Sequence, residues 1–106
     1  MMIKKLKKYI IKNNLHKKAI EDFWIAFNNW KNNHPEDYKI SFNNISHEEL
    51  DVFIHAIGLK SSQWPECDYS HVTITIFIHY KDIQLGCYTD LFSLGTADGD
   101  DFLEIY

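Results

Sequence analysis

One segment constrains the fold of this chain more than any other: in residues 71–80, two series of side chains alternate without interruption. The core-facing series is Val72, Ile74, Ile76, Ile78 and Tyr80, and the intervening series is His71, Thr73, Thr75, Phe77 and His79. Successive side chains of a strand point to opposite faces, so this alternation of β-branched residues predicts a strand with one buried face. Such a strand needs partner strands and a layer that covers its apolar face.

The sequence after this strand predicts its partners. Residues 81–82 are expected to form a tight turn, and a returning strand runs from residue 83 to about residue 92. The side chains expected to face the core on that strand are Ile83, Leu85 and Cys87. Residues 95–100 are rich in turn-forming types, and residues 102–106 predict a final short strand.

The first half of the chain indicates helices. A lysine-rich helix is expected at about residues 2–13, and a longer amphipathic helix at about residues 16–32. The apolar stripe of the longer helix is Ala19, Ile20, Phe23, Trp24, Phe27 and Trp30. Pro35 should stop this helix, because the residue before a proline disfavours the helical conformation.

Two further elements are expected in the middle of the chain. The alternation of Tyr38, Ile40 and Phe42 with polar residues predicts a short strand. Residues 46–49 fit a capping box, in which the Ser46 hydroxyl and the Glu49 carboxylate satisfy free amides, and they predict a helix that Gly58 ends. The buried face of that helix would consist of Leu50, Phe53, Ile54 and Ile57.

These elements predict a single domain, residues 1–106, of the α+β class. We expect an antiparallel β-meander of three to five strands, with N-terminal and central helices packed on one face. Cys67 and Cys87 cannot form a disulfide framework alone, and we interpret both as reduced thiols. No window is apolar enough for a signal peptide or a membrane span, so the expected location is cytoplasmic, with no membrane partner.

Charge is divided unevenly along the chain. Seven of the eleven basic residues, all lysines, lie in residues 1–18, which hold no acid, whereas all fifteen acids follow and the net charge is −4. From Asp82 to the end, every charged residue is an acid. This acidic end predicts a docking surface for a basic partner and not direct binding of nucleic acid, and the alternative is a solvated acidic loop. The lysine-rich helix is interpreted as a solvated basic face.

The predicted partner-binding residues combine charges with aromatic anchors. Trp64 stands in a polar loop beside acids, where a tryptophan is either an interface anchor or a side chain folded back on the sheet. The complete set is Trp64, Glu66, Tyr88, Asp90, Asp98, Asp100, Asp101 and Glu104.

Catalytic and metal chemistry are weakly indicated. His71 and His79 share a strand face, but eight residues of extended chain separate them by about 26 Å, too far to act on one bond. Asp98-Gly99-Asp100-Asp101 lacks the ligand spacing of a calcium loop. The parity of Cys87 with Ile83 predicts a core thiol and not a nucleophile. We therefore expect no enzyme activity, no cofactor and no metal.

Residues 70–106 resemble small bacterial immunity proteins of contact-dependent growth inhibition and related polymorphic toxin systems. The resemblance lies in the segments Val72–Ile76 and Tyr80–Tyr88, which give a strand–turn–strand rhythm, and in the Asp-Asp-Phe-Leu-Glu of residues 100–104. It implies a cytosolic, non-enzymatic protein that binds the C-terminal domain of a cognate toxin and blocks its basic active-site cleft, expected to be that of a nuclease. The alternatives are a small regulatory or adaptor domain and a small RNase that uses His71 or His79.

Overall fold

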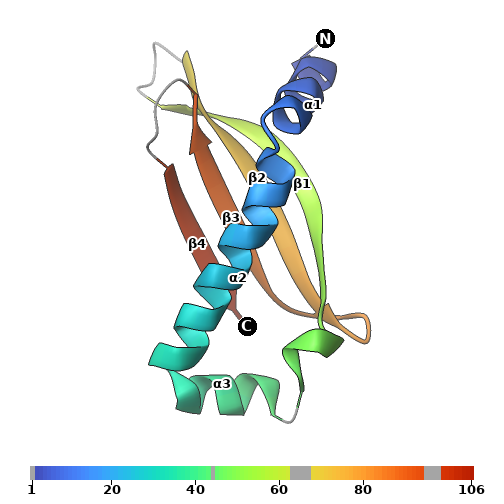
Figure 1. Ribbon diagram of the computed structural model, residues 1–106, viewed down its shortest axis with the longest axis vertical. Coiled ribbons are helices and arrows are strands. Elements are labelled where there is room, and N and C mark those ends of the chain that lie inside the picture. The colour runs from blue at the N-terminus through green and yellow to red at the C-terminus, as the bar shows by residue number, and fades with distance from the viewer. Residues whose placement is uncertain (1, 44, 63–67, 95–98) are drawn as a thin grey trace.

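Four antiparallel strands form one sheet whose spatial order follows the chain, β1-β2-β3-β4 (Figure 1). The strands are β1 (Asp51–Ser62), β2 (Asp68–Tyr80), β3 (Ile83–Ser93) and β4 (Gly99–Ile105). They follow the helices α1 (Met2–Lys12), α2 (Leu15–Asn33) and α3 (Pro35–Phe42) and the short 3₁₀ helix η1 (His47–Glu49). The computed structural model describes residues 2–43, 45–62, 68–94 and 99–106. The predicted α+β meander is confirmed.

Helix α2 lies across one face of the sheet and supplies the centre of the core (Figure 1). The predicted alternation of β2 is confirmed: its four aliphatic residues from Val72 to Ile78 have no exposed surface. Phe23 and Phe27 of α2 are equally buried in the same cluster, and the Phe27 ring lies 5.4 Å from that of Phe42 in α3. Each such side chain contributes about 2–3 kcal/mol of burial free energy. None of the described helices combines the length and hydropathy needed to cross a membrane.

The strand predicted at residues 38–42 is wrong, because these residues belong to α3. Pro35 occupies the first helical turn, where its missing N–H is not needed, and Glu36 and Asp37 follow it at the positive end of the helix. Tyr38 and Phe42, one turn apart, stack with ring centroids 5.3 Å apart. Thus Pro35 ends α2 and also starts α3.

The helix predicted at residues 46–58 is also wrong. The Ser46 hydroxyl does accept a bond from the Glu48 amide (3.4 Å), but it caps only η1, and the chain then extends into β1. A β-bulge explains the error: Ile54 pairs with Ile76 and Ala56 with Thr75, so His55 is an extra residue. The bulge moves the next core-packed residue to Ile57, three positions after Ile54, which mimics helical spacing.

A second bulge overturns the predicted facing of Cys87. The turn itself is confirmed, since Lys81 and Asp82 both have positive φ (48° and 66°) as hairpin turns require. However, His79 pairs with Gln84 and Ile78 with Gly86, which leaves Leu85 as the extra residue. One added residue exchanges the two faces of a strand. Cys87 therefore pairs with Phe77 on the face away from α2, and this half-buried residue is not a core thiol. Leu85 does pack against the core cluster, whereas Ile83, the first residue of β3, is 63% exposed.

Candidate acidic binding site

The predicted partner-binding residues that the structure describes lie on two neighbouring strands. Tyr88 and Asp90 belong to β3, and Asp100, Asp101 and Glu104 belong to β4, the edge strand. The other three predicted residues, Trp64, Glu66 and Asp98, lie outside the described residues. The antiparallel pairing of β3 with β4 therefore brings residues ten or more positions apart into one region, as expected for a hairpin.

The acidic residues of β4 divide between the two faces of the sheet. Asp101 pairs with Asp90, on the face that α2 covers. Glu104 pairs with Cys87 on the opposite face, where its Oε2 lies 4.0 Å from the Cys87 Sγ. Asp100, Asp101 and Glu104 are all exposed, so the edge strand presents negative charge to solvent on both sides.

Tyr88 is not the surface anchor that the sequence predicts, because its side chain has no exposed surface. Its ring packs edge-on against Phe23 at a centroid distance of 5.7 Å. Its hydroxyl donates a 2.8 Å hydrogen bond to Oδ2 of Asp101. Burial, followed by that bond, raises the pKa of Tyr88, so the hydroxyl remains protonated and holds the Asp101 carboxylate in place.

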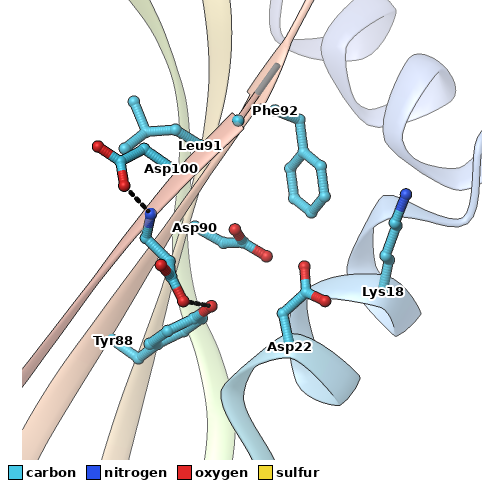
Figure 2. A pocket seen from close by; sticks show the side chains of 9 residues that line it. Lys18, Asp22, Tyr88, Asp90, Leu91, Phe92 and Asp100 are labelled. Carbon is cyan, nitrogen blue, oxygen red and sulfur yellow. Dashed lines mark hydrogen bonds between the residues drawn. The ribbon is translucent and has the colours of Figure 1, made fainter. Parts of the chain in front are cut away.

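Asp90 is a buried acid, with only 4% of its surface exposed. The pKa of Asp90 is raised to about 8, first by burial and then by the carboxyl groups of Asp22 and Asp101, against the opposing effect of Lys18. The carboxyl group of Asp22 faces that of Asp90 from α2 (Figure 2). Two carboxyl groups that face each other in this way repel when both are ionised, so the pair favours a state in which one of them carries a proton.

These side chains surround an open cavity of about 260 Å³ between α2, β3 and β4 (Figure 2), which we call the acidic cavity. Its charged lining consists of Asp22, Asp90, Asp100, Asp101 and Lys18. No ion pair within 4 Å joins Lys18 to these aspartates, all of which are described residues. Four carboxyl groups thus share one lysine that none of them contacts directly, and the cavity suits a cation.

Sequence reasoning missed Asp22 and Lys18. The signal was available in α2: Asp22 lies beside the buried position Phe23, and Lys18 precedes it by one helical turn. An acid at the margin of a buried stripe must lie close to whatever the stripe packs against. Which strand residue it meets depends on how α2 crosses the sheet.

The histidines predicted for an RNase alternative do not form a catalytic pair. His71 and His79 lie at opposite ends of β2 on the sheet face away from the core. His79 instead belongs to an aromatic cluster, in which its ring lies 5.0 Å from Phe53 and 5.9 Å from Phe77. The His55 ring stacks on Phe77 at 3.9 Å. Within the described ranges, no group of three or more His, Cys, Asp or Glu residues is arranged to hold a metal ion.

Comparison of the chain with models of protein families, with curated proteins and with solved structures gave no match. The function is therefore inferred from the charges and geometry of the site.

Proposed function

We propose that this chain is a cytoplasmic immunity protein that binds a cognate toxin domain and occludes its basic active-site cleft, which we take to be that of a nuclease. The observation that carries this proposal is the gathering of four aspartates around one open cavity beside an exposed acidic edge strand. The resemblance of residues 70–106 to immunity proteins supports it.

The arrangement suits inhibition by charge complementarity. A nuclease cleft is lined with cations that bind phosphates, and a surface of carboxylates can occupy it in their place. Electrostatic attraction speeds the encounter, which matters for a protein that must reach a toxin before its substrate does. Because β4 is an edge strand, its free backbone groups can also pair with a strand of the toxin.

Growth rescue tests the immunity function directly. The C-terminal domain of the protein encoded immediately upstream is expressed in cells with and without this chain, and the complex is then purified from the surviving cells. We expect growth to be restored and the two proteins to elute together. Absence of both rescue and complex would show that the chain does not neutralise that protein.

Charge reversal tests the docking surface within the same assay. Asp100→Lys combined with Glu104→Lys reverses two exposed charges of β4, and Glu48→Lys combined with Glu49→Lys reverses two exposed charges of η1 as a matched control. Close interfacial charge pairs couple by about 1.5 kcal/mol or more, so we expect each lost pair to weaken the complex by about tenfold. Equal affinity of the two double variants would exclude β4 from the interface.

A further inference from the structure

A buried carboxyl oxygen in the acidic cavity lacks a hydrogen-bond partner. Oδ2 of Asp90 is buried and accepts no hydrogen bond, and Asp90 as a whole is only 4% exposed. The group opposite is another carboxyl, that of Asp22, which can donate only when it is itself protonated (Figure 2). A buried polar atom without a partner costs about 1–3 kcal/mol, and more when it is charged. In the free protein a proton on this pair of carboxyl groups relieves part of the cost.

The remaining carboxylates of the cavity are held in position before any partner binds. The Tyr88 hydroxyl fixes Asp101, and the Asp101 amide donates a 2.8 Å hydrogen bond to Oδ1 of Asp100 (Figure 2). The residues that line the cavity come from three different elements, α2, β3 and β4, and the carboxyl groups of Asp22 and Asp90 face each other across it. A binding site that is ordered in advance loses little entropy when it is filled.

We propose that the acidic cavity receives the guanidinium group of an arginine side chain presented by the toxin, with Asp90 and Asp22 as its inner ligands. This inference rests on the proposed function and specifies the chemistry of the contact. A guanidinium carries five N–H donors in a planar fork, which can satisfy carboxylate oxygens from several directions at once. A metal ion fits less well, because the described residues offer no metal-ligand grouping.

Filling the cavity in this way expels a proton. At neutral pH, Asp90 is mainly protonated, since its pKa is about 8. The charged groups that face it are Asp22 and Lys18 from α2 and Asp101 from β4, with the Tyr88 hydroxyl alongside. A guanidinium favours the ionised form of Asp90, so binding below pH 8 releases about one proton. The affinity therefore increases by up to about tenfold for each unit by which the pH rises toward 8.

The test uses the whole chain and methylguanidinium as the probe, with urea as a neutral planar control. Amide chemical shifts are followed by NMR during titrations at pH 6 and pH 7. We expect saturable shifts at Asp22, Asp90 and Asp101 with methylguanidinium only, and an affinity about tenfold higher at pH 7 than at pH 6. Asp22→Asn and Asp90→Asn should each weaken binding by about tenfold or more, because a charge-assisted bond is lost. Glu21→Gln, on the exposed side of α2, is the matched control and should have no effect.

Shifts that do not saturate, that appear equally with urea, or that persist unchanged in both cavity variants would overturn the proposal. Two variants are used so that a folding defect in one leaves the other informative. The outcome is independent of growth rescue. A chain that rescues growth without binding methylguanidinium is an immunity protein that docks otherwise. A chain that binds the probe without rescuing growth has an arginine site for a different partner.

Discussion

The buried carboxyl of Asp90 should make the protein less stable as the pH rises, and Asp90→Asn should abolish that dependence. The folded protein holds the Asp90 proton up to about pH 8, whereas the unfolded chain releases it near the ordinary value of 3.8. Between these limits the folded state binds about one proton more, so the free energy of unfolding falls by about 1.4 kcal/mol per pH unit. The loss of stability due to Asp90 is absent below about pH 4, increases through neutral pH and levels off above about pH 8.

Urea denaturation at pH 5, 6 and 7 measures this effect. Between pH 5 and pH 7, the free energy of unfolding of the native sequence should fall by about 2–3 kcal/mol relative to Asp90→Asn. The six histidines contribute equally to both proteins, and their contribution cancels in the difference. Glu21→Gln removes an exposed acid from α2 and should leave the dependence of the native sequence unchanged. Parallel pH profiles for the native sequence and Asp90→Asn would refute the reasoning that Asp90 is buried against like charge.

Four further substitutions, one of which is a matched control, test the packing and the turn by thermal and urea unfolding. Gly86→Ala should destabilise by about 1–3 kcal/mol, because its Cβ would overlap a backbone carbonyl of β4, and an unchanged stability would place the two strands further apart. Phe27→Ala should lower the free energy of unfolding by about 3–5 kcal/mol, because a fully buried ring is lost. Ile25 is 61% exposed on the same helix, so Ile25→Ala, the matched control, should lower it by less than about 0.5 kcal/mol. Similar losses for the two variants would contradict the placement of α2. Asp82→Gly should stabilise the protein by up to about 1 kcal/mol, because φ is 66° at this position and glycine adopts positive φ without the steric cost of a Cβ. No gain in stability would indicate that the turn has another geometry.

The elements that sequence reasoning located correctly are those with an uninterrupted local period. The alternation in β2, the apolar stripe of α2 and the turn at Lys81 and Asp82 each depend on consecutive residues, and each is confirmed. The errors occur where a β-bulge breaks the period. One extra residue, His55 in β1, turned a strand pattern into helical spacing, and another, Leu85 in β3, reversed the expected facing of Cys87.

For the site, the sequence by itself determined that the last strands are acidic, and the tertiary structure decided which acids act together. A charge count is a property of composition, so the negative surface of β4 followed from the residues alone. The meeting of Asp22 with Asp90 depends on where α2 crosses the sheet and on the register that the bulge at Leu85 sets. Had that bulge been absent, Asp90 would face away from α2, because each added residue exchanges the two faces of a strand.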